Sequence, residues 1–115
     1  MDVFDCNVVL FESEDLEEGI VVECTVGGDG SLVVLQESYG PLTAVSFGES
    51  PHRVELVAGP AAVRALLAYF HLDSSWQLPF VLRFECAGVD SCLRVRELLQ
   101  RLGLPFEEID EPAAA

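Results

Sequence analysis

The first half of the chain alternates short apolar runs with turn residues, and this pattern predicts a series of β-strands. The runs are rich in β-branched and aromatic side chains and occupy residues 3–11, 20–26, 32–37, 43–47 and 52–57. The glycine-rich turn at 27–30 favours a hairpin, because glycine adopts positive φ without steric cost. The acidic stretch 12–18 is expected to connect the first two strands. We therefore expect an antiparallel meander of about five strands.

After Gly59 the apolar spacing becomes helical. Pro60 suits a first helical position, and the apolar positions Val63, Leu66, Leu67 and Phe70 follow at i, i+3, i+4 and i+7. A helix is therefore predicted over residues 60–71. Residues 78–86 alternate as in a strand, yet Ser75 could cap a helix there, and we favour the helix.

A last helix is predicted over 91–102, with Asp90 or Ser91 as its cap and Gly103 as its end. Its expected inward residues are Leu93, Leu98, Leu99 and Leu102. A short closing strand is predicted over 104–109, and the tail 111–115 is expected to be frayed. The whole pattern indicates one α+β domain, residues 1–110, whose two or three C-terminal helices pack on one face of the sheet.

Charge is distributed very unevenly along this pattern. The chain has a formal net charge of −14, contains no lysine, and has all six arginines between Arg53 and Arg101. Residues 1–52 hold eleven acidic side chains and no arginine. Such a distribution repels nucleic acid and anionic membranes and favours a basic protein partner.

Other class signals point to an ordinary cytoplasmic domain. The hydrophobic fraction of 50% argues against disorder despite the net charge. The opening residues Met1-Asp2-Val3 contain no basic segment of a secretion signal, and no apolar run approaches the ~20 residues of a membrane span. The four cysteines form no CxxC and no zinc-ligand spacing, so we expect buried free thiols.

Candidate chemistry is sparse. Neither G-x-S-x-G, a P-loop, GxGxxG nor HExxH occurs, and we predict no enzyme, cofactor or metal. His52 and His71 are expected to be structural. An enzyme would require one of them to lie in a cleft beside an acidic partner. Calcium is disfavoured at 12–18 because the order of an EF-hand loop is missing, and Trp76 is expected to cap the core rather than to anchor an interface.

The acidic residues therefore form the candidate site. Carboxylates on a rigid sheet, without neighbouring cations, can occupy a basic groove and steer association with it. The predicted partner-binding residues lie in the first connection and in the C-terminal segment, which we expect to meet across one end of the sheet. They are Glu12, Glu14, Asp15, Glu17, Glu18, Glu107, Glu108, Asp110 and Glu111.

Several turn and core segments resemble a group of small bacterial proteins. The matching pieces are residues 29–34, Gly40-Pro41, residues 47–50 and the stretch Gly103-Leu104-Pro105-Phe106-Glu107. The resemblance covers residues 19–110 and implies a hairpin meander followed by helices. In size, acidity and arginine-only composition the group is similar to immunity proteins that neutralise bacterial polymorphic toxins. The matching positions are structural, so the resemblance implies no functional residue.

We therefore expect a non-catalytic acidic module, most concretely an immunity protein that binds the basic active-site region of a toxin such as a nuclease or deaminase. One alternative is a phage anti-defence protein that mimics DNA toward a host nuclease. A second is a structural subunit that associates with itself through the sheet edge. A third is a small enzyme built on one of the histidines.

Overall fold

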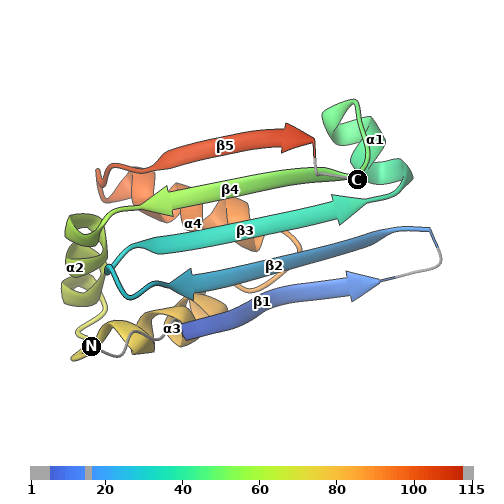
Figure 1. Ribbon diagram of the computed structural model, residues 1–115. Coiled ribbons are helices and arrows are strands. Elements are labelled where there is room, and N and C mark those ends of the chain that lie inside the picture. Colours follow the sequence, from blue (N-terminus) through green and yellow to red (C-terminus); the bar gives the residue numbers. More distant parts are fainter. Residues whose placement is uncertain (1–5, 15–16, 113–115) are drawn as a thin grey trace.

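The computed structural model describes residues 6–14 and 17–112, the last two by their backbone alone. Five antiparallel strands form one sheet whose spatial order follows the sequence (Figure 1). The strands are β1 (Cys6–Glu14), β2 (Gly19–Val26), β3 (Leu32–Tyr39), β4 (His52–Ala58) and β5 (Glu107–Pro112). The predicted α+β class and the meander are confirmed.

Four helices and one 3₁₀ turn complete the fold: α1 (Pro41–Phe47), α2 (Pro60–Tyr69), η1 (Ser75–Gln77), α3 (Leu78–Glu85) and α4 (Ser91–Arg101). In Figure 1, α3 and α4 lie behind the sheet, α2 covers one of its ends, and α1 lies at the opposite end. The helices predicted over 60–71, 78–86 and 91–102 are therefore present. No helix in the described part of the chain is long and apolar enough to cross a membrane.

The core lies between the sheet and the C-terminal helices. Strand residues alternate between buried and half-buried, and the buried set includes Val22, Cys24 and Val34, which are fully enclosed. Leu66 of α2, Leu82 of α3 and other helix residues close this core from one side. The period of two along each strand therefore assigns one face of the sheet to the core and the other to the outside.

The strand predicted over 43–47 is wrong, because this segment belongs to α1. Pro41 at the first helical position pre-sets the helical φ, and Gly48 ends the helix in the left-handed conformation at φ 78°. These end signals prevail over the β-propensity of Val45 and Phe47. The strand expected at 52–57 is consequently β4.

Two boundaries at the edges of the sheet also differ from expectation. β1 continues through Glu14, so Glu12–Glu14 belong to a strand and not to the predicted connection, while residues 3–5 lie outside the described part. β5 begins only at Glu107, after Pro105, which cannot donate to a strand ladder. It runs through Pro112, two residues into the segment expected to be frayed.

One inward residue of the last helix was also predicted wrongly. Leu93 is exposed, and Val95 takes its place among the buried residues of α4, whereas Leu98 and Leu99 are buried as expected. Leu93 and Leu98 lie five residues apart, which is roughly 140° around a helix of 3.6 residues per turn. They therefore cannot share one narrow face.

Candidate partner-binding site

The face of the sheet opposite the helices forms the most distinctive surface of this chain. Among the described residues, no helix covers it (Figure 1). The alternation along the strands assigns six acidic residues and one arginine to this open face. They are Glu12, Glu14, Glu23, Glu37, Glu55, Glu107 and Arg53. We call this surface the open face.

A β-bulge decides which acids of β1 belong to the open face. The register of β1 and β2 shifts between Val9 and Phe11, so that Phe11 pairs with Val22, which is a core position. A bulge inserts one unpaired residue and so reverses the alternation that follows it. Because of this shift, Glu12 pairs with the outward Val21. Without it, Glu12 and Glu14 would point toward the helices.

Acidic and apolar residues alternate across the open face. Leu35 lies between Glu23 and Glu55 in the strand register, and Val21 lies between Glu12 and Glu37. Neighbours across strands have Cβ atoms roughly 4.5–5.5 Å apart. These four carboxylates are therefore each flanked by an aliphatic side chain, whereas Glu14 lies opposite Gly19. A carboxylate beside an aliphatic side chain suits the head and the stem of a lysine or arginine.

These carboxylates have few partners within the chain. Glu14 accepts a hydrogen bond from the Tyr39 hydroxyl at 3.1 Å, and this bond raises the pKa of Tyr39. The carboxylates of Glu12, Glu23 and Glu37 form no ion pair with any described residue, and the same holds for those of Glu55 and Glu107. Arg53, the one cation assigned to this face, lies opposite Glu37 in the register, so the open face keeps a net excess of negative charge.

One end of the open face forms a groove. Glu12, Glu14 and Glu37 line this groove of about 320 Å³ together with Tyr39 and Pro51. The described residues contain no cluster of His, Cys, Asp and Glu that could hold a metal ion. The groove therefore offers separated carboxylates, which suit an organic cation better than a bare metal ion.

Helix α1 adds an apolar element beside this groove. Leu42 and Val45 are 67% and 83% exposed. The helix starts after Gly40, where an added Cβ would come within 2.4 Å of the Glu17 carbonyl oxygen, so α1 begins directly against the β1–β2 connection. An exposed apolar pair next to unpaired carboxylates is typical of an interaction surface.

The structure brings together only part of the predicted set. Glu12 and Glu14 lie on β1, and Glu17 and the half-buried Glu18 follow at the same end of the sheet, whereas Asp15 lies outside the described residues. Two other acids of the predicted set contact basic side chains within the protein. Glu108 accepts from Arg96 of α4 at 3.2 Å, and Asp110 contacts His52, so these two carboxylates face the helix side.

The last two members of the set lie on β5. Glu107 is opposite Val57 and belongs to the open face. The backbone of Glu111 pairs with Arg53 near the groove end of the sheet. Both acids therefore lie on the edge strand farthest from β1, with three strands between them and Glu12.

His52 occupies a buried position between two carboxylates. Its Nδ1 lies 2.7 Å from Glu49 Oε2, its Nε2 contacts Asp110 Oδ1, and its ring stacks on Phe47 at a centroid distance of 4.0 Å. Ionised carboxylates only accept hydrogen bonds, so this arrangement is satisfied when both ring nitrogens carry a proton and donate. Neither nitrogen is left to act on a substrate, and the ring joins the turn before β4 to β5.

His71 has a different, conformational role. It lies just beyond α2 with φ 57°, and its backbone N–H donates to the Ala68 carbonyl, while Leu72 N–H donates to Leu67. These two bonds form a Schellman motif, which ends a helix with one left-handed residue. His71 is exposed and makes no side-chain hydrogen bond to a described residue.

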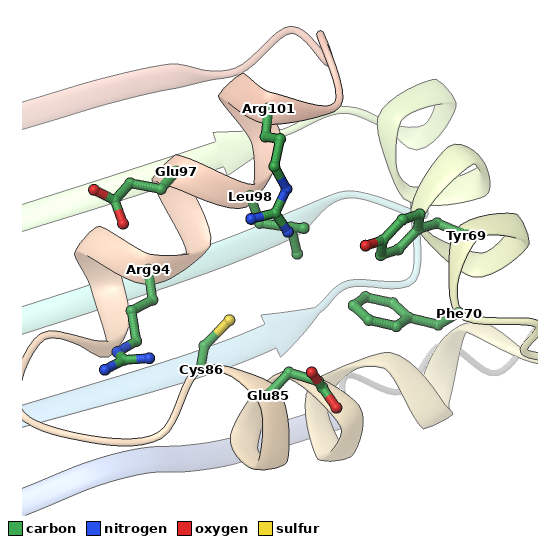
Figure 2. A pocket seen from close by; sticks show the side chains of 8 residues that line it. All are labelled: Tyr69, Phe70, Glu85, Cys86, Arg94, Glu97, Leu98 and Arg101. Carbon is green, nitrogen blue, oxygen red and sulfur yellow. The ribbon is translucent and has the colours of Figure 1, made fainter.

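A separate cavity of about 160 Å³ lies among α2, α3 and α4 (Figure 2). Tyr69 and Phe70 form one wall, and the cationic side chains Arg94 and Arg101 project from α4. Glu85 and Glu97 balance these two cations, and the Nε of Arg94 donates to Asp90 at 3.0 Å. The cavity thus has no excess of either charge, in contrast to the open face.

The cysteines show no sign of activation. Cys86, which borders this cavity, has a raised thiol pKa because of burial and of nearby Glu85. Burial raises the pKa of Cys92 to about 11 and that of Cys24 further still. All four cysteines are free thiols, as expected, but Cys6 is only half-buried. Thiols that stay protonated at neutral pH are poor nucleophiles.

The sequence prediction omitted three acids that the open face contains, namely Glu23, Glu37 and Glu55. Each stands between two inward residues of its strand, so the alternation in the sequence placed it on the opposite face. The alternation was visible in the sequence, and together with the expectation that the helices pack on one face it assigns these acids to the other face. The prediction weighted the dense acidic run at 12–18 instead.

Trp76 was expected to cap the core, yet it is 57% exposed and contacts Phe80 edge-on.

Comparison with known proteins adds no further assignment: no protein-family model, curated protein or solved structure matches the chain.

Proposed function

We propose that this chain is a non-catalytic binding module for a basic protein surface, and most concretely an immunity protein that covers the basic active-site region of a bacterial toxin. One observation supports this above the others: the open face carries six acids against one arginine, and none of its carboxylates forms an ion pair with a described residue. A partner that supplies lysine and arginine side chains would complete these pairs.

The physical advantage of such a surface lies mainly in the rate of association. With a net charge of −14, the chain attracts a basic partner over a distance of roughly 10 Å at moderate salt, the Debye length. After encounter, the flanking Val21, Leu35 and Val57 can bury the aliphatic stems of the partner's basic residues. Leu42 and Val45 of α1 supply an apolar anchor at the rim of the same surface.

The surroundings of the histidines favour binding over catalysis. His52 lies beside acidic groups, as a histidine-based enzyme would require, but both of its ring nitrogens are occupied. His71 is exposed and has no acidic hydrogen-bond partner among the described residues. Neither histidine thus offers a free base in a cleft, which is what general-base catalysis needs.

The proposal is tested with the purified product of the gene adjacent to this one. We expect a complex in biolayer interferometry, and we expect co-expression to restore growth of cells that produce the adjacent protein. Failure to bind it and to protect the cells would refute the immunity role.

A matched pair of variants then locates the binding surface. One variant changes three acids of the open face, Glu12→Gln, Glu23→Gln and Glu37→Gln. The other changes three exposed acids on the helix side, Asp73→Asn, Glu85→Gln and Glu97→Gln, and has the same net charge. The open-face variant should associate about tenfold more slowly at low salt, with a weaker salt dependence. Equal losses in both variants would mean that net charge alone, and not this face, governs binding.

A further inference from the structure

The edge strand β1 is the least protected backbone in the sheet. Among the described residues, β1 pairs with β2 alone, so its other edge offers unpaired N–H and C=O groups. The opposite edge strand, β5, contains Pro112 and a run of acids, both of which discourage pairing with another chain. β1 has no proline, and its first half, Cys6–Val9, carries no charge.

A stripe of exposed aromatic side chains runs along η1 and α3 beside this edge. Trp76, Phe80 and Phe84 follow at four-residue spacing and are 57%, 49% and 83% exposed. A groove of about 490 Å³ separates the stripe from the strand and is lined by residues 7–12, Phe80 and Arg83. Three exposed aromatic residues in one row are unusual on the surface of a monomer.

We propose that two copies of this chain associate about a two-fold axis, with β1 paired antiparallel to the β1 of the second copy. Such an axis stands perpendicular to the sheet, so both helix layers fall on the same side. Because α3 lies along β1, the two aromatic stripes then meet and are buried against each other. The contact is isologous, and it closes after two copies.

The distribution of charge favours a second copy of this chain over a strand from a basic partner. The groove has one acid, Glu12, and one cation, Arg83, so it exerts little net attraction on a basic segment. In an antiparallel pair, the acidic second halves of the two β1 strands point away from each other. The copies can therefore meet at their least charged edge while the open faces stay free, which separates this contact from the partner-binding site.

Sedimentation and light scattering test the proposal on the full chain. We expect a species of twice the 12.5 kDa chain mass that dissociates on dilution and strengthens with added salt, because salt screens the repulsion between two acidic copies. A monomer at every concentration and salt level would overturn the proposal.

Two substitutions of equally exposed residues identify the contact. Phe84→Glu introduces a charge into the aromatic stripe of each copy and should convert the dimer into a monomer. Val45→Glu, on α1, changes a residue that is also 83% exposed and should leave the dimer intact. Hydrogen exchange should show added protection of β1 amides in the dimer relative to the Phe84→Glu monomer. A dimer that survives Phe84→Glu, or that protects no amide of β1, would place the contact elsewhere.

Discussion

At the scale of single residues, His52 shows how a polar group can organise the end of an apolar sheet. Its side chain is 5% exposed, and it is held by Glu49, Asp110 and the ring of Phe47. A buried ring with both nitrogens bonded joins residues 47–52, which run from the end of α1 to the start of β4, to Asp110 of β5, 58 residues further along the chain. The position of β5 therefore depends on a side chain outside that strand.

Replacing His52 should reveal this role. We expect His52→Ala to lower the free energy of unfolding by about 2 kcal/mol, since charged hydrogen bonds are lost and a cavity forms, while the partial exposure of both carboxylates limits the loss. The shift of the urea midpoint at constant slope measures the effect. Gln100→Ala, an exposed helix substitution, serves as the control. Equal midpoints in the two variants would show that the histidine does not hold these segments together.

Burial also controls the reactivity of the cysteine thiols. The pKa of the Cys92 thiol rises from 9.0 to about 11 because burial disfavours the thiolate. In the folded protein at neutral pH, iodoacetamide should therefore modify Cys92, Cys24 and Cys86 far more slowly than the half-buried Cys6, as read by mass spectrometry. Labelling of all four at the rate of Cys6 would contradict this burial.

The same raised pKa has a consequence for stability. A thiol whose pKa is higher in the folded chain than in the unfolded chain favours folding below the unfolded value. This contribution is lost as the pH rises through the folded value. The urea midpoint should accordingly fall between about pH 9 and pH 11. Cys92→Ser should flatten this fall, provided that the midpoints are compared relative to each protein's own value at pH 7.

At the scale of elements, two helix ends share one backbone conformation but differ in the residue that adopts it. Two helices end in the same Schellman motif: α2 with His71 at φ 57° and α4 with Gly103 at φ 69°. A non-glycine residue in the left-handed region costs roughly 1–2 kcal/mol. The two ends therefore form a natural comparison between an unfavourable and a favourable residue in one conformation.

Exchanging these residues should move stability in opposite directions. His71→Gly should raise the free energy of unfolding by about 1 kcal/mol, and Gly103→Ala should lower it by a similar amount. An added Cβ at Gly103 meets no atom within 4 Å, so the loss would report conformation and not a clash. Thermal unfolding of both variants checks the prediction. A loss of stability in His71→Gly would show that the imidazole makes a contact worth more than the strain it causes.

The sequence predicts correctly those elements that are bounded by glycine or proline and whose apolar residues recur at a regular spacing. β2 and β3 are bounded by the glycines at 27–30, and α2 begins at Pro60 with its apolar stripe in phase. The sequence pattern does not predict α1, because Pro41 and Gly48 suit a turn as well as a helix end and the segment between them is rich in residues that favour strands. The bulge in β1 left no mark in the sequence, although it determines the face to which Glu12 belongs.

At the scale of the whole molecule, the candidate site was only partly predictable. The excess of acid is plain in the sequence, but its placement depends on which face of the sheet the helices cover. That choice moves Glu23, Glu37 and Glu55 into the site and turns Glu108 and Asp110 toward Arg96 and His52. A charge count gives the sign of the excess charge, and only the fold shows on which surface that charge lies.

Carboxylates without ion pairs on one face should lower the stability of the isolated protein. Glu12 and Glu37 are two strands apart, roughly 10 Å, and Glu23 lies diagonally between them. Repulsion over this range destabilises the sheet at low salt, and Arg53, opposite Glu37 in the register, offsets only part of it. The variant Glu12→Gln, Glu23→Gln, Glu37→Gln should gain about 1 kcal/mol of unfolding free energy at low salt, and its urea midpoint should respond less to added sodium chloride.

The helix-side variant Asp73→Asn, Glu85→Gln, Glu97→Gln supplies the contrast. Glu85 and Glu97 lie in the cavity of Figure 2 with Arg94 and Arg101, so their neutralisation removes attraction as well as repulsion and should bring no gain. If the open-face variant instead lost stability at low salt, its carboxylates would have structural roles within the chain. A gain in stability together with slower binding would be the signature of charge kept for a partner at the expense of the fold.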